Sequence, residues 1–210
     1  KDLTTATLAG KRFGVYKTFM EDSLYVNAIA VIKSQGAEII DIEAADVPLP
    51  DFLKLLNLDM KKDLVTYLST YGDSKLKYTS IEDIMRFNAT DSLDIMPYGQ
   101  ALFQGISNDS ATAEEFANIK ATLKANGKRF FDEPMTALNL DGVLSINNYN
   151  AGHAAVAEYP AITVPMGYTA SSEPKGLTFI SGRLREKQLL QWAYSYEQAS
   201  KMRRAPVHYN

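Results

Sequence analysis

The sequence of 210 residues contains no cysteine. Disulfide bridges, thiolate metal sites and cysteine nucleophiles are therefore excluded. Histidine is almost as scarce, because only His153 and His208 are present. These two lie far apart, and neither has a second ligand at the spacing of a metal site. We therefore predict no bound metal and no cofactor.

The chain also lacks a long apolar run and an excess of charge. No stretch reaches the length that spans a bilayer, and no signal peptide is recognisable. Lys and Arg number 22 against 25 Asp and Glu, which gives a net charge of -3. Because the basic residues are also spread along the chain, we expect neither nucleic acid nor a membrane as a partner. The sequence begins at Lys1 without an initiator Met, so we expect an upstream segment in the gene product.

The common motifs of nucleotide binding and serine catalysis are missing. There is no G-x-G-x-x-G, no P-loop and no G-x-S-x-G. Ser172 and Lys175 fit the pattern S-x-x-K, which activates serine when a helical turn joins the two residues. Here Pro174 disfavours a helix at the residue before it, so we predict a surface hairpin turn and no nucleophile. His153 lies among small residues and is interpreted as structural.

The remaining composition suits a globular α/β protein. Apolar residues make up 46% of the chain, which is enough to build a sizeable core. We predict a mixed, largely parallel sheet of about five strands covered by helices, in one body of 210 residues without an internal boundary. The expected strands lie at residues 12–17, 37–43, 141–147, 161–166 and 177–181. The expected helices lie at residues 24–35, 52–70, 80–87, 97–106, 113–125 and 185–204.

Several of these elements have predicted ends. Asp22 or Ser23 can cap the first helix, and Gly36 can end it. Thr79 with Glu82 forms a candidate capping box. Further predicted ends are a helix entered through Pro97, a helix that stops near Gly127, and cations at Lys201, Arg203 and Arg204 in the last turn of the closing helix.

The C-terminal region carries a series of motifs in a recognisable order. They run "YPAITVPMGY", then "PKGLTF", then "GRLREKQLLQWAYSYEQ". In this order they resemble the C-terminal segment of the amidase signature family of serine hydrolases. Glu158 stands where that family usually has Gly. "LAGKRFGVYK", "GAEIIDIE", "DMKKDLVTYL", "SIEDIMRFN" and "MPYGQALF" are also similar to family segments, so the resemblance covers nearly all of the chain.

The resemblance implies that the parent protein hydrolyses carboxylic amides with a Ser nucleophile, a second Ser on a cis peptide and a Lys base. The family carries these residues in its N-terminal half, and this sequence has no Gly/Ser-rich G-G-S-[SG]-G-G-S segment to match. No catalytic residue is therefore assigned here, and the chain alone is expected to be inactive. The resemblance places a substrate-facing loop at Asn147, Asn148 and Tyr149. Phe87 and Met96 are further candidates for the substrate pocket.

Other interpretations of these residues and of the chain stay open. Asn147 and Asn148 also suit a plain turn after a strand, and Phe87 and Met96 suit core packing. The chain itself could be a non-catalytic α/β module that binds a small ligand, or part of a subunit of a tRNA-dependent amidotransferase. The expected partners are a small-molecule amide, the N-terminal half of the same protein and, for the isolated fragment, a second copy of itself.

Overall fold

A computed structural model describes residues 3–205 of the chain, and His208 lies outside this part. The described residues group into two compact units. Unit 1 contains the chain up to Leu49 and from Leu123 onward, and unit 2 contains Pro50–Thr122. Composition does not change at either junction, which explains why the sequence suggests no boundary. That the whole chain forms part of one amidase domain stays a prediction.

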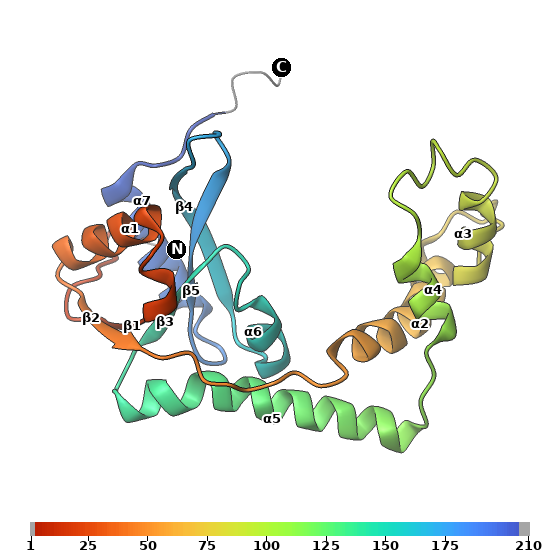
Figure 1. Cartoon of the computed structure of the whole chain (residues 1–210), viewed down its shortest axis with the longest axis horizontal. Helices are drawn as coiled ribbons and strands as arrows, with labels where there is room; N and C mark the ends of the chain where they lie inside the picture. The colour runs from red at the N-terminus through yellow and green to blue at the C-terminus, as the bar shows by residue number, and fades with distance from the viewer. Residues whose placement is uncertain (1–2, 206–210) are drawn as a thin grey trace. The chain divides into compact units, whose positions relative to one another are not determined.

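Unit 1 is built on an open, mixed five-stranded sheet in the order β2-β1-β3-β5-β4 (Figure 1). The strands are β1 (Arg12–Tyr16), β2 (Glu38–Ile42), β3 (Gly142–Ile146), β4 (Ala161–Tyr168) and β5 (Pro174–Ile180). β1 pairs in parallel with β2 and β3, whereas β5 pairs antiparallel with β3 and β4. The α/β class and the five strands are thus confirmed, with the parallel pairings on the β2 side and the antiparallel pairings on the β4 side.

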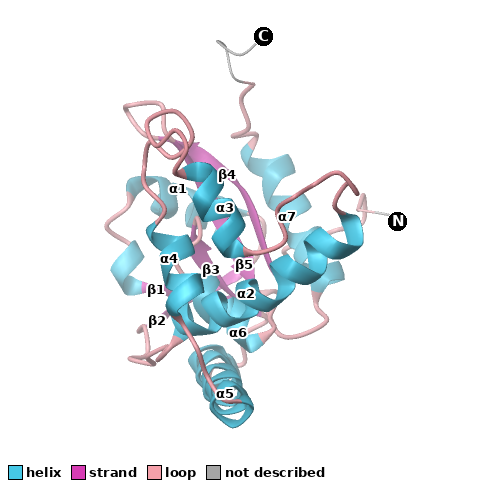
Figure 2. Cartoon of the chain, turned by 90° about the vertical axis from the view of Figure 1, so that its right-hand side faces the viewer, coloured by secondary structure: helices cyan, strands magenta, loops and turns pink. Residues whose placement is uncertain are grey.

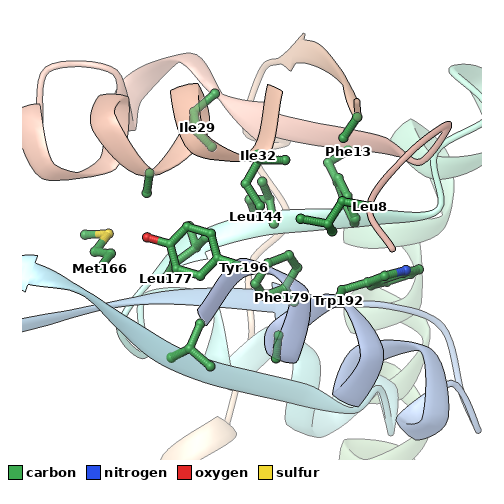
Figure 3. Packing of buried hydrophobic residues seen from close by; sticks show 14 of the residues in the cluster. Leu8, Phe13, Ile29, Ile32, Leu144, Met166, Leu177, Phe179, Trp192 and Tyr196 are labelled. Carbon is green, nitrogen blue, oxygen red and sulfur yellow. The ribbon is translucent and has the colours of Figure 1, made fainter. Parts of the chain in front are cut away.

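Helices cover both faces of this sheet because its strands alternate two sets of buried side chains. On one face, Phe13, Leu144 and Phe179 pack against α1 (Ser23–Ser34) and α7 (Glu186–Ser200) (Figure 3). On the other face, Val143 and Ile180 pack against α6 (Ala151–Ala157) and the part of α5 (Ala113–Ala137) that belongs to unit 1. Buried residues of both signs of the alternation therefore give unit 1 a core on each side of its sheet.

Gly127 lies inside α5, where the sequence predicts the end of a helix. A Cβ at this glycine would lie 2.7 Å from the carbonyl oxygen of His153 and 2.8 Å from the backbone nitrogen of Ala157. The missing side chain thus lets α5 approach the backbone of α6. The predicted helix end near Gly127 is wrong, because this glycine serves helix contact rather than termination.

Unit 2 consists of helices and connecting loops (Figure 2). Its helices are α2 (Phe52–Tyr71), α3 (Ile81–Asn88), α4 (Ala101–Asn108) and the first residues of α5. The amide of Asn57 donates to Asp109 at 2.7 Å, and the Lys61 ammonium donates to the carbonyl oxygen of Ser107 at 2.7 Å. These contacts join α2 to the end of α4, where a cation also suits the helix dipole.

The structure corrects three other predicted ends. Ser80 and Asp83 form the capping box of α3, one position beyond the predicted pair, because the Ser80 hydroxyl accepts from the Asp83 backbone. α4 begins at Ala101 and not at Pro97, since Gly99 has a φ of 75° that interrupts a helix. α7 ends at Ser200, where Lys201 takes a left-handed conformation, so the basic residues follow the helix rather than occupy its last turn.

Other ends are confirmed. The side chain of Asp22 accepts from the backbone of Leu24 and Tyr25 at the start of α1. Gly36 follows this helix with a φ of 85°, as expected for a left-handed helix end. The short helix α6 has no counterpart among the predicted elements, since its run of small residues offers no apolar periodicity.

Candidate functional site

The candidate site lies at the edge of the unit 1 sheet where β1 and β3 end. Because β5 runs antiparallel to β3, its first residues meet the end of β3 at this edge. The neighbouring loop after β1 leads into the start of α1. We call the residues gathered here the strand-end cluster: Asp22, Asn147, Asn148, Tyr149, Lys175 and Gly176.

Asn147 is bound to β5 through both its backbone and its side chain. Its backbone N–H donates to the Gly176 carbonyl at 2.9 Å, and its side-chain Oδ1 accepts from the Gly176 N–H at 2.7 Å. The Thr178 hydroxyl donates to the Asn147 carbonyl at 2.5 Å. Asn147 also has a φ of 47°, a left-handed conformation that asparagine tolerates better than most residues. Its side chain therefore holds the turn after β3.

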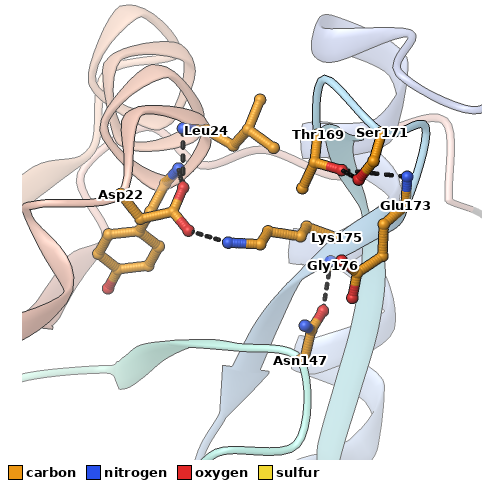
Figure 4. A network of polar contacts seen from close by, with 9 residues as sticks. Asp22, Leu24, Asn147, Thr169, Ser171, Glu173, Lys175 and Gly176 are labelled. Atoms are coloured by element: carbon orange, nitrogen blue, oxygen red, sulfur yellow. Dashed lines mark hydrogen bonds and ion pairs between the residues drawn. The ribbon is translucent and has the colours of Figure 1, made fainter.

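Asp22 and Lys175 form an ion pair beside this turn (Figure 4). Their side chains are 17% and 23% exposed, so the pair is largely shielded from water. Burial alone would raise the pKa of Asp22, but the Lys175 ammonium and the N–H groups of Tyr25 and Leu24 outweigh it and lower that pKa. The hydrogen bond from Lys175 to the Asp22 carboxylate in turn raises the pKa of Lys175. Both groups are charged at neutral pH.

Asn148 and Tyr149 are the exposed members of the strand-end cluster. Within residues 3–205, the side chain of Asn148 has no hydrogen-bond partner, and its carbonyl accepts from the Ala151 N–H. The Tyr149 ring is 58% exposed and contacts the edge of the Phe19 ring, with 5.6 Å between ring centroids. An amide side chain and a phenol hydroxyl are thus available at this edge to bind a polar ligand.

Phe87 and Met96 belong to unit 2 and are described within that unit alone. The Phe87 side chain is 44% exposed and its ring lies 5.2 Å from the ring of Tyr78. Met96 is partly buried, and its carbonyl accepts from the Gly99 N–H at 2.8 Å. Both side chains retain exposed area for a ligand, and their assignment to a substrate pocket stays a prediction.

Ser172 lies between β4 and β5 and not on a helix. Its backbone N–H donates to Thr169 at 2.9 Å, and its φ is 66°. Lys175 is bound to Asp22 instead of the serine hydroxyl. The prediction of a hairpin turn in place of an S-x-x-K nucleophile is confirmed.

His153 makes structural contacts on α6. Its Nε2 atom lies 2.8 Å from the carbonyl oxygen of Val47, and its ring stacks on Phe130 with 4.0 Å between centroids. The interpretation of His153 as a structural residue is thus confirmed. Within residues 3–205, no three acidic or histidine side chains lie close enough to hold a metal ion.

The ion pair is the part of this site that the sequence does not predict. Asp22 is recognised only as a helix cap, and Lys175 only as part of a turn. The two are 153 positions apart, so no local pattern joins them. The structure in fact places Lys175 on β5, which begins at Pro174.

Comparison with known proteins yields relatives of one kind, although no family model matches the chain. A protein named as a probable amidase from Arabidopsis thaliana is 24% identical over 214 residues, which covers 97% of this chain and 41% of the relative. A glutamyl-tRNA(Gln) amidotransferase subunit from Clostridium botulinum is 25% identical over 230 residues, covering 95% of this chain and 47% of the relative.

Solved structures agree with these relatives. An amidase family protein from Bacillus anthracis has a TM-score of 0.85 and 28% identity, covering 95% of this chain and 40% of that structure. A peptide amidase from Stenotrophomonas maltophilia has a TM-score of 0.82 and 24% identity, covering 95% and 45%. The chain thus spans less than half the length of these proteins. In sequence and fold it matches the C-terminal half of proteins of the amidase signature family.

Proposed function

We propose that this chain is the C-terminal half of an amidase that hydrolyses carboxylic amides to an acid and ammonia or an amine. The observation that carries the proposal is the match to the Bacillus anthracis amidase family protein, since it combines a TM-score of 0.85 with 28% identity over 95% of the chain. The named relatives also act on amide nitrogen or bear the name amidase. The chain covers less than half of each, so the activity belongs to a longer protein.

The proposed mechanism is that of the family that the sequence resembles. A neutral Lys, with its pKa lowered by burial, removes a proton from the nucleophilic Ser through a second Ser hydroxyl. The Ser oxygen attacks the amide carbonyl, backbone N–H groups stabilise the oxyanion, and the amine departs. Water then releases the acid from the acyl-enzyme. We place these catalytic residues upstream of Lys1.

Hydrogen bonding within this chain is consistent with an upstream catalytic centre. Among the bonds of residues 3–205, no serine hydroxyl is joined to a Lys or His side chain that could act as its base. The nearest candidate from the sequence, Ser172, lies in the β4–β5 turn. Under the proposal, this half supplies the sheet, its covering helices and part of the substrate pocket.

We assign the pocket contribution to Asn148 and Tyr149, with Phe87 and Met96 as further lining residues. Asn148 offers an unpaired amide, and Tyr149 offers a hydroxyl beside an aromatic surface. Such groups can orient the polar part of an amide while the ring contacts its apolar part. Asn147, by contrast, uses its side chain to hold Gly176, so we expect it to act on the substrate through the shape of the turn.

The partner that we propose is the N-terminal half of the same protein. The exposed face of α2 carries large apolar side chains at helical spacing, namely Leu53, Leu56, Met60, Tyr67 and Tyr71. β2 and β4 are the outer strands of the unit 1 sheet and leave unpaired edges. Isolated from its partner half, the fragment is expected to cover such surfaces by forming a homodimer.

The decisive experiment measures ammonia release from a panel of primary amides. The 210-residue chain is compared with the longer gene product at equal concentration. We expect activity only in the longer protein, and unchanged activity when Ser172 in that protein is replaced by Ala. Amide hydrolysis by the short chain would contradict the proposed location of the catalytic residues. No activity from either protein on any amide would contradict the proposed function.

The pocket assignment has its own test in the longer protein. Asn148→Ala and Tyr149→Phe are expected to raise KM for a good amide several-fold, because they remove ligand contacts and leave the catalytic groups in place. Lys187→Ala, an exposed residue on α7, is the matched control. Unchanged kinetics in both pocket variants would remove Asn148 and Tyr149 from the pocket.

A further inference from the structure

We propose that the Asp22–Lys175 ion pair is a positioning device for the candidate substrate turn at Asn147–Tyr149. The inference rests on the proposed function only for its catalytic consequence, whereas the positioning itself is a property of this chain. Neither residue touches the proposed ligand groups. They act through Gly176, the neighbour of Lys175 in sequence, which holds Asn147.

The backbone pairing at the start of β5 is weak, which is why a side-chain contact matters here. The regular pairing of β3 with β5 extends to Ile146 opposite Leu177 and stops before Gly176. On the other side, the register between β4 and β5 shifts between Pro165 and Gly167. Pro165 also has no N–H to donate to a neighbouring strand. The first residues of β5 therefore need another tether.

Lys175 provides this tether to α1. Its ammonium binds one oxygen of Asp22, while the other oxygen of Asp22 accepts the N–H of Leu24 at 2.9 Å (Figure 4). The carboxylate is therefore fixed by the first turn of a 12-residue helix, and through it so is the start of β5. Gly176 then presents its N–H and its carbonyl to Asn147 at 2.7 and 2.9 Å.

Close packing supports the same geometry. A Cβ on Gly176 would lie 2.3 Å from Cγ2 of Thr163 and 3.6 Å from Oδ1 of Asn147. Only a glycine lets β4 and the Asn147 side chain approach β5 together at this point. The turn after β3 thus depends on where β5 begins, and the ion pair determines that position.

The test uses two variants that break the pair by different routes. Lys175→Met removes the ammonium and keeps most of the aliphatic stem. Asp22→Asn removes the carboxylate charge but retains an oxygen that can cap α1, since Asn and Asp are comparable caps. Lys175→Arg is the conservative variant that keeps a cation. Lys17→Met is the matched control, because Lys17 pairs with Glu43 in an exposed contact outside the strand-end cluster.

The first measurement is NMR on the 210-residue chain. In Lys175→Met and Asp22→Asn we expect the Gly176 N–H signal to move upfield, because its bond to Asn147 weakens. Amide hydrogen exchange at Gly176 and Tyr149 should become about fivefold faster, as expected for loss of one shielded ion pair. Lys175→Arg should restore both values, and Lys17→Met should change neither. An unchanged Gly176 signal, or equal acceleration across the whole sheet, would overturn the proposal.

The second measurement is kinetic and uses the longer protein. If it hydrolyses amides, Lys175→Met should raise KM about threefold with little change in kcat, because the turn orients substrate and performs no chemistry. A loss confined to kcat would overturn the positioning role. A longer protein inactive on all amides would refute the proposed function, and the NMR result would still decide the positioning role.

Discussion

The contact between α5 and α6 at Gly127 leads to a prediction in which two physical effects oppose each other. Replacement of a helical glycine by alanine normally stabilises a helix by about 1 kcal/mol. At Gly127, however, the new methyl group would lie 2.6 Å from Cγ2 of Val156 as well as 2.7 Å from the His153 carbonyl oxygen. Ordinary contacts of these kinds are longer, so the methyl group requires α6 to move.

The magnitude follows from which atoms are in the way. Overpacking of a core costs about 1–3 kcal/mol, and the upper end applies when no side chain can rotate to relieve it. Two of the three contacts at Gly127 are to backbone atoms, at His153 and Ala157, so rotation of Val156 relieves only one of them. Subtraction of the helix gain leaves Gly127→Ala less stable than the wild type by about 2 kcal/mol. For a chain of this size, the midpoint of thermal unfolding falls by about 4–8 °C.

The assay is urea unfolding of the 210-residue chain followed by fluorescence of Trp192, its single tryptophan, which is 3% exposed. Ala125→Gly is the control, because Ala125 is an exposed residue of the same helix and reports the intrinsic helix preference alone. We expect Ala125→Gly and Gly127→Ala both to destabilise. A Gly127→Ala variant more stable than the wild type would show that helix preference prevails, and it would refute close packing of α5 on α6.

Three further predictions follow from individual contacts. Tyr25→Phe should cost about 1 kcal/mol in urea unfolding, because its buried hydroxyl donates to Leu144 at 2.9 Å, whereas Tyr16→Phe should be neutral or stabilising, because its buried hydroxyl has no partner. Asp22→Asn should cost about 1 kcal/mol at pH 7; because the folded-state pKa of Asp22 is lowered, the stability that its charge gives is present above its ordinary value of 3.8 and lost as pH falls through the folded value, so the difference from wild type should vanish at low pH. Replacement of Leu56, Met60 and Tyr67 together by Gln should lower self-association of the isolated chain in light scattering without loss of helical circular dichroism, and unchanged self-association would remove the α2 face from the proposed interface.

Local sequence patterns are sufficient to predict the strands of the sheet and the first helix. β1 and β2 are short, apolar and β-branched, and the helix between them has a cap at Asp22 and a glycine at its end. Each of these signals acts within a few residues, so tertiary contacts do not need to be known. The predicted parallel pairing of β1 and β2 also follows from the strand-helix-strand order and is confirmed.

Prediction fails where a residue serves a neighbour that is distant in sequence. Gly127 has the composition signal of a helix end, but its role is set by α6, which lies more than twenty positions away. The same limit applies to the strand-end cluster. The resemblance points to Asn147, Asn148 and Tyr149, but only the structure shows that Asn147 is occupied by Gly176 while Asn148 and Tyr149 remain accessible.

The two units differ in how completely they bury their own apolar surface. Unit 1 has a core on each face of its sheet, with Phe13, Phe179 and Phe131 fully buried. In unit 2, α2 is 20 residues long, yet Asn57 is its one buried residue and its apolar side chains remain exposed. Burial of apolar area is the main source of stability, so unit 1 can hold its structure without further partners, whereas unit 2 gains most from one. The strand-end cluster lies entirely in unit 1. The candidate turn is therefore held in place by the better packed part of the chain, as a site that orients a substrate requires.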